Sequence, residues 1–189
     1  MLSDLIKKCR SYRRFSQKEK IDKQTMLKLI DLARLSANAQ NKQPLKYIVV
    51  NNDKKNALVY SCLKWAGALI DWDGPAPDER PTGYIIIIGD KEIKQSFGID
   101  HGIAAQSIML GAVEAGFGGC MVGSILKSKL NDILKLNHKY EILLVLALGV
   151  PGETVIIDEV KNNKTDYWRT ENDIHHVPKR SLAEIILKT

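Results

Sequence analysis

Apolar residues recur at intervals of three and four in several parts of the chain, which is the pattern of helices with one buried face. The first such segment begins at residue 2 and ends near Arg10. The second begins at Asp22, a residue type that favours helix N-caps, and continues to about residue 36. A further helix is expected over 53–65. Residues 100–115 combine apolar and small side chains, so we predict a buried helix there that its neighbours approach closely.

Three other segments have the composition of β-strands, at residues 47–50, 84–88 and 142–148. Residues 84–88 are apolar at every position rather than at alternate positions, which predicts a central strand covered on both faces. Residues 182–187 fit either a short final helix or an added strand. Helices therefore flank a small sheet, and the expected fold is an α+β or three-layer domain.

The segment after the last of these strands is different, because residues 152–179 are polar and carry few periodic apolar positions. We expect an extended C-terminal arm over about residues 152–189. Such an arm is stable if it wraps around a partner subunit, which we predict. We find no internal repeat and no low-complexity segment, so residues 1–189 are expected to form a single domain, arm included.

Composition narrows the class of protein. Hydrophobic residues make up 44% and charged residues 26% of the 189 positions, which excludes a disordered chain, a coiled coil and a collagen-like fibre. The longest apolar runs are too short to span a bilayer, and the first ten residues are too charged for a secretory signal. The three cysteines are widely spaced and form no CxxC pair, so we expect no disulfide framework, no zinc site and a cytoplasmic location.

The formal net charge of +6 leaves three kinds of partner open: nucleic acid, an anionic membrane, or an anionic small ligand. The nucleic-acid hypothesis rests on the charge alone, because the chain has no basic stripe with interleaved aromatic residues. Arg10, Ser11, Arg13 and Arg14 form a basic cluster at the end of the first predicted helix. Guanidinium groups beside a hydroxyl suit a phosphate, although a solvated basic loop has the same composition.

Two further segments have compositions that suit the binding of a ligand. Gly116, Gly118, Gly119 and Gly123 directly follow the predicted core helix, and glycines there let backbone amides approach a flat or anionic ligand; the alternative is a tight turn. The amide-rich loop 36–44 suits a ring with alternating carbonyl and NH groups, such as a flavin or pterin; the alternative is a polar turn. No acid/base pair, nucleophile or metal cluster stands out. Together these features are typical of an enzyme whose cofactor does the chemistry.

Four segments, in order, resemble the nitroreductase family of FMN-dependent oxidoreductases over nearly the whole chain. Residues 10–15, RSYRRF, resemble its R-S-x-R-x-F motif. Residues 33–44, ARLSANAQNKQP, resemble A-x-x-S…N-x-Q-P-W. Residues 100–124 are similar to D-x-x-x-A-x-Q…G-x-G-x-C-W-I-G, and 144–151 to a strand ending in A-L-G-x-P. Leu45 and Met121 stand where the family often has aromatic residues, which softens the expected pocket walls.

The resemblance implies a three-layer α/β/α sandwich with a mostly antiparallel central sheet. It also implies a homodimer with FMN at the subunit interface. Arg10, Ser11 and Arg13 would hold the FMN phosphate and ribityl chain, completed by Lys179 and Arg180, with Arg169 as a further candidate. The amide-rich loop of one subunit would meet the flavin bound by the other, through Asn38, Ala39, Gln40, Asn41 and Gln43. The segment that follows Gly119 would lie against the flavin ring system, through Met121, Val122, Gly123 and Ser124.

The activity implied by the resemblance is a two-step hydride transfer. FMN would take a hydride from NADH or NADPH and then reduce a nitroaromatic, quinone, flavin or similar small acceptor, with no side chain as the catalytic group. Trp65 or Trp72 would cover the flavin in place of the missing aromatics, although Trp65 also fits a core position. The alternative function is a flavin-binding carrier or sensor without turnover. No nucleic-acid or membrane partner is expected.

Overall fold

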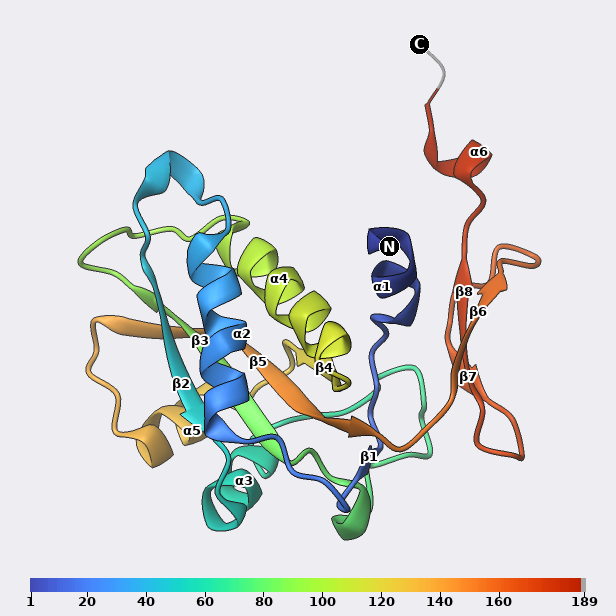
Figure 1. The fold of residues 1–189 in the computed structure, drawn as a ribbon, viewed down its shortest axis with the longest axis horizontal. Coiled ribbons are helices and arrows are strands. Elements are labelled where there is room, and N and C mark those ends of the chain that lie inside the picture. The colour runs from blue at the N-terminus through green and yellow to red at the C-terminus, as the bar shows by residue number, and fades with distance from the viewer. Residues whose placement is uncertain (188–189) are drawn as a thin grey trace.

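A five-stranded antiparallel sheet forms the centre of the structure, a computed structural model that describes residues 1–187 (Figure 1). One edge of the sheet is β2, followed by β3 and then β5. Beyond β5 lie β4 and β1, which both pair with that long strand. The bounds are Phe15–Ser16 for β1, Leu45–Val50 for β2, Gly83–Asp90 for β3, Gly118–Val122 for β4 and Tyr140–Pro151 for β5.

The strand β3 is central, as the sequence predicts, and all eight of its residues are buried. Ile85 and Ile87 point to one face of the sheet, whereas Tyr84 and Ile86 point to the other. Side chains alternate between the two faces of a strand, so a strand that is apolar throughout requires cover on both sides.

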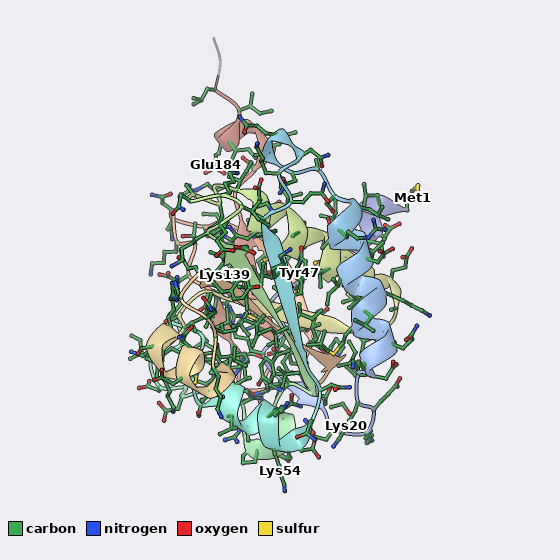
Figure 2. The ribbon with its side chains drawn as sticks, turned by 90° about the vertical axis from the view of Figure 1, so that its left-hand side faces the viewer. Met1, Lys20, Tyr47, Lys54, Lys139 and Glu184 are labelled. Carbon is green, nitrogen blue, oxygen red and sulfur yellow. The ribbon has the colours of Figure 1, made fainter. Side chains whose placement is uncertain are left out.

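Helices supply that cover and complete three layers. One face packs against α2 (Lys23–Leu35) and α4 (Asp100–Glu114), and α1 (Leu2–Lys8) lies on α4. The other face packs against α3 (Asp53–Tyr60) and α5 (Lys127–Leu134). Figure 2 looks from the side of β2, the strand that carries Tyr47, and shows α2 on one side of the sheet and α5 on the other.

Most helix boundaries agree with the sequence pattern, with one clear difference. The side chain of Asp22 caps α2 by accepting a hydrogen bond of 2.9 Å from the Thr25 amide. The expected helix 53–65, however, ends at Tyr60, and Asn52 is its N-cap. The chain leaves the helix in a turn at residues 61–62, after which Leu63 forms an antiparallel bridge with Ile125.

The glycines after α4 form both a turn and a strand: Gly116 lies in the turn with a φ of 83°, and the next two glycines lie in β4. Gly118 and Gly119 begin β4, and Gly119 pairs with Leu148 of β5. A Cβ atom at Gly119 would lie 2.5 Å from the carbonyl oxygen of Ala147, so only glycine allows this close approach of β4 to β5.

Gly119→Ala is therefore expected to lower the free energy of unfolding by about 1–3 kcal/mol, because backbone must shift to relieve the clash. Urea unfolding of the purified protein measures the change. Gly102→Ala in α4 is the control: no atom lies within 4 Å of its added Cβ, so stability should stay level or rise. Equal midpoints for Gly119→Ala and the unmodified protein would contradict the steric argument.

The segment after β5 forms a second, smaller sheet. Strand β8 (His175–Lys179) pairs in parallel with β6 (Val155–Glu159) and antiparallel with β7 (Trp168–Arg169). Of the two alternatives for the last segment, a short helix is correct, α6 (Leu182–Ile185). Figure 1 shows this sheet beside the main one, with α6 beyond it. In the part of the chain that the structure describes, every helix is too short or too polar to cross a membrane.

Candidate functional site

The predicted phosphate-binding segment lies along the outer edge of β4. Ser11 forms a parallel bridge with Gly119, and the Tyr12 amide donates a hydrogen bond of 2.9 Å to the Gly119 carbonyl. Arg10 donates from Nη2 to the carbonyl of Ile6 at 2.6 Å, at the end of α1. Its buried Nε has no hydrogen-bond partner within residues 1–187. The segment is thus held in place while one guanidinium donor of Arg10 stays available.

A buried carboxylate ties this segment to the small sheet. One oxygen of Glu153 accepts hydrogen bonds from the amides of Arg13 at 2.5 Å and Arg14 at 3.1 Å. Its other oxygen accepts from Nη2 of Arg169 on β7 at 2.8 Å. The Glu153 side chain is 1% exposed and that of Arg169 is 10% exposed. Because one carboxylate holds two backbone amides and a guanidinium, the position of residues 13–14 depends on Glu153.

The side chain of Arg13 turns toward β8. Its Nη1 donates to the carbonyl of Ser11 at 3.2 Å and lies 3.3 Å from Nε2 of His175. The guanidinium carbon is 4.5 Å from the ring centroid of Tyr167, a cation–π contact. A guanidinium can only donate, so Nε2 of His175 accepts and the imidazole is neutral. Burial lowers the pKa of His175 to about 4, and the charges of Arg13 and Arg169 act in the same direction.

Arg169 lies between Glu153 and Trp72. Its guanidinium carbon is 4.3 Å from the Trp72 ring, and its Nε and Nη1 atoms are buried without a partner among the described residues. Of the basic residues expected to complete the phosphate site, Arg169 is the one linked to residues 13–14. Lys179 and Arg180 are exposed, and Arg180 pairs with Glu184 at 3.4 Å. Lys179 lies four residues along β8 from His175, or about 13 Å.

The residues expected to face the flavin ring occupy the other end of the same edge. Met121 on β4 is 37% exposed and Val122 is buried, whereas Gly123 and Ser124 are exposed. The Ser124 carbonyl accepts a hydrogen bond of 3.0 Å from the amide of Lys64. The edge of β4 is therefore flanked by the Ser11 segment at one end and by residues 63–65 at the other.

Trp65 belongs to the core. It is 9% exposed, and its ring stacks on Tyr60 at 5.8 Å between centroids. The packing cluster around it includes Cys62 and Val122. This accounts for the indole as a core residue, and a contact between Trp65 and a flavin stays a prediction.

The amide-rich loop forms a separate part of the site. It contains the short helix η1 (Ala39–Asn41), and Gln40, Asn41 and Gln43 all have positive φ. The Asn38 carboxamide oxygen accepts from the Gln43 amide at 2.8 Å. These bonds shape one wall of a cavity of about 180 Å³ between the loop and the start of α4.

Asp100 at the start of α4 anchors that loop. The carboxylate is 2% exposed; it accepts from the Ala39 amide at 3.0 Å and from Nζ of Lys94 at 3.0 Å. Burial opposes ionisation of Asp100, but these hydrogen bonds and the lysine charge outweigh it and lower the pKa of the carboxyl group. The loop is thus held by an ionised, fully paired carboxylate.

One chain does not bring all predicted site residues together. The amide-rich loop precedes β2 at one edge of the sheet, whereas Ser11 and Met121 lie at the edge formed by β4. Three strand spacings of about 4.8 Å place these edge strands roughly 14 Å apart. Sequence reasoning missed Glu153 and Tyr167, because neither lies in a recognisable motif and both act on residues far along the chain.

Comparisons with known proteins agree on the fold. The model of the Nitroreductase family matches residues 6–150, which is 145 of the 189 residues. The FMN-dependent nitroreductase of Clostridium difficile R20291 is 24% identical, with a TM-score of 0.65 over 79% of this chain and 87% of its own. A nitroreductase family protein of Clostridium novyi NT is 24% identical, with a TM-score of 0.66 over 97% and 98%.

The NADPH:FMN oxidoreductase of Vibrio harveyi, solved in complex with NAD+, is 19% identical, with a TM-score of 0.63 over 80% of this chain and 69% of its own. A search of curated protein sequences finds no match. At these identities the solved structures establish the fold alone, whereas the family model covers most of the chain. The chain therefore belongs to the nitroreductase family of oxidoreductases.

Proposed function

We propose that this protein is an FMN-dependent oxidoreductase that uses NADH or NADPH to reduce a small acceptor such as a nitroaromatic, a quinone or a flavin. The observation that carries the proposal is the set of guanidinium groups beside the edge of β4. Arg10, Arg13 and Arg169 bring three positive charges to this region, and Glu153 supplies one negative charge. The net charge of these four side chains is therefore positive, which favours the binding of a phosphate dianion.

Unpaired donors support a phosphate at this place. The buried Nε of Arg10 and the buried Nε and Nη1 of Arg169 have no partner among residues 1–187. A buried donor without an acceptor costs about 1–3 kcal/mol, so native proteins seldom leave such donors unpaired. The residues present therefore fit the phosphate group of FMN, and Ser11 adds a hydroxyl beside them.

The chain's own residues would position the cofactor and substrates. Arg10, Ser11 and Arg13 would hold the phosphate together with Arg169, and Lys179 and Arg180 are further candidates at the end of the arm. The exposed edge of β4 from Met121 to Ser124 would present backbone amides to the ring. FMN, when bound, supplies the ring that accepts and donates the hydride. The protein contributes orientation and a positive field, and no side chain need transfer the hydride.

A homodimer would complete the site. The loop Asn38–Gln43 lies at the opposite edge of the sheet from Ser11, so we infer that it meets the flavin bound by the partner subunit. Apolar residues are exposed where such an interface would form: Leu2 is 63% exposed on α1, Ile99 is 75% exposed before α4, and Leu182 is 71% exposed on α6. The arm would then cover the partner. Three free thiols suit a reducing cytoplasm.

Titration with FMN tests the proposal. The protein freed of ligand is expected to bind FMN, and Arg10→Ala is expected to weaken binding ten- to hundredfold, since a charged hydrogen bond contributes about 1.5–3 kcal/mol. Flavin absorbance and fluorescence report binding, and the bound flavin should bleach on addition of NADH or NADPH. Lys127→Ala, which removes an exposed cation paired with Glu141, is the matched control and should bind FMN normally.

Three outcomes would each contradict a different part of this proposal. Failure of the full chain to bind FMN would overturn the cofactor assignment. Tight FMN binding without any oxidation of NADH or NADPH above that of free FMN would indicate the alternative function, a flavin carrier or sensor. Equal FMN affinity of Arg10→Ala and the unmodified protein would place the phosphate elsewhere. Sedimentation of the same sample distinguishes a homodimer from a monomer.

A further inference from the structure

A second cleft lies at the other end of the molecule from the amide-rich loop, between α3, the short helix η2 (Pro77–Glu79) and the start of β3. We call it the α3 cleft. Its volume is about 210 Å³, far more than the roughly 15 Å³ that one water molecule needs. Asn56, Tyr60, Arg80 and Tyr84 line it, and Lys20 and Asp53 stand at its rim. Lys20 and Lys54, labelled in Figure 2, mark this end of the molecule.

Three residues that line this cleft each carry a buried polar atom without a hydrogen-bond partner in residues 1–187: Oδ1 of Asn56, the hydroxyl of Tyr84 and Nε of Arg80. Asn56 is 8% exposed and Tyr84 is 0% exposed. The Asn56 side chain is fixed, because its Nδ2 donates 2.9 Å to the carbonyl of Thr82. Only nitrogen can donate there, so the oxygen is the atom left without a partner. Buried groups of this kind normally have a partner.

The charges around the cleft do not cancel. Lys20 and Asp53 form an ion pair at 2.8 Å, which neutralises the rim. The guanidinium of Arg80 lies 3.9 Å over the ring of Tyr60, and it forms no ion pair within the described part of the chain. One positive charge therefore remains. Burial raises the pKa of Tyr84, so its hydroxyl stays protonated and can donate a hydrogen bond.

These groups define what a ligand must offer. The Arg80 Nε and the Tyr84 hydroxyl donate, and they require an acceptor that balances the surplus positive charge; a carboxylate does both. The Asn56 oxygen accepts, and it requires a donor from the same molecule. An ammonium donor would add to the positive charge, whereas a hydroxyl would not. We propose that the α3 cleft binds a small hydroxycarboxylate, with its carboxylate on Arg80 and Tyr84 and its hydroxyl on Asn56.

The proposal is tested on the full chain without FMN or nicotinamide, by isothermal titration and amide chemical-shift mapping with lactate and malate. Saturable binding that perturbs residues 53–60 and 80–84 is expected. Tyr84→Phe should weaken it about tenfold, since it removes one hydrogen bond to a carboxylate. Arg80→Lys, which keeps the charge but lacks Nε–H, should weaken it as well. Tyr140→Phe, on β5 outside the cleft, is the matched control and should bind normally.

Two smaller ligands separate the contributions of the carboxylate and the hydroxyl group to binding. Acetate lacks the hydroxyl and glycerol lacks the carboxylate, so each should bind more weakly than lactate. If neither lactate nor malate binds saturably, the proposal is overturned, and ordered water would fill the cleft instead. Unchanged affinity in Tyr84→Phe, or glycerol binding as tightly as lactate, would also overturn it. Thermal unfolding of each variant confirms that it is folded. FMN takes no part in these measurements, so their outcome is independent of the proposed activity.

Discussion

Glu153→Ala is expected to lower the free energy of unfolding by about 3–5 kcal/mol, the range found when one member of a buried ion pair is removed. The substitution leaves the Arg169 guanidinium buried without a counter-charge. It also removes the acceptor for the amides of Arg13 and Arg14. Urea unfolding followed by circular dichroism measures the change. Glu141→Ala removes an exposed partner of Lys127, and should change stability by less than about 0.5 kcal/mol.

Two further variants locate the origin of the effect. Glu153→Gln keeps one carbonyl acceptor for the amides but removes the negative charge, so its loss of stability should be smaller than that of Glu153→Ala. Replacing both Glu153 and Arg169 by apolar residues should cost less than Glu153→Ala alone, because no charge is then left buried. A loss below about 1 kcal/mol in Glu153→Ala would show that the carboxylate is not needed to hold the small sheet.

Acidification from pH 7 to pH 4 is expected to remove about 3 kcal/mol of stability through His175 alone. The folded protein lowers the pKa of this group from 6.5 to about 4, so between these values the unfolded chain binds the proton and the folded chain does not. Stability is therefore full above the unfolded pKa and falls as the pH decreases toward 4. The cause is the fully buried position of the ring beside Arg13.

Unfolding free energies measured from pH 4 to pH 7 test this expectation. His175→Asn keeps a neutral acceptor for Arg13 and cannot be protonated, so its stability should depend less on pH than that of the unmodified protein. The control is His138→Asn, a substitution at an exposed position, which should leave the pH dependence unchanged. Identical pH profiles for His175→Asn and the unmodified protein would contradict a neutral, buried His175.

Local patterns were sufficient to predict most of the fold. The continuous apolar run at 84–88 predicted a central strand, and β3 is that strand, because only a position between two other strands and two helix layers buries every side chain. Asp22 marked the start of α2 because a carboxylate can accept from a free amide in the first turn. The end of α3 was predicted five residues too late, since Trp65 follows the apolar pattern of a helix but packs after a turn.

The candidate site was predictable in parts. The residues of each motif are local in sequence, so the basic cluster, the glycine segment and the amide-rich loop could each be found by composition. Their relative placement could not be found in this way. Ser11 pairs with Gly119 although more than a hundred residues separate them in the sequence, and Gly118 and Gly119 belong to a strand that follows the turn at Gly116. The pairing of strands depends on the whole sheet, because each strand must align in register with a neighbour that can lie far away in the sequence.

The amino-acid sequence by itself determined the layers, the central strand and the family, and it predicted the residue types of the proposed phosphate and flavin site. Only the tertiary structure decided which charges meet. Glu153 accepts a hydrogen bond from the Arg13 amide, 140 residues away in the sequence, and it pairs with Arg169 rather than with Lys179 or Arg180. The physical reason is that periodicity and capping act within a few residues, whereas the energy of a buried charge depends on every group that folding brings around it.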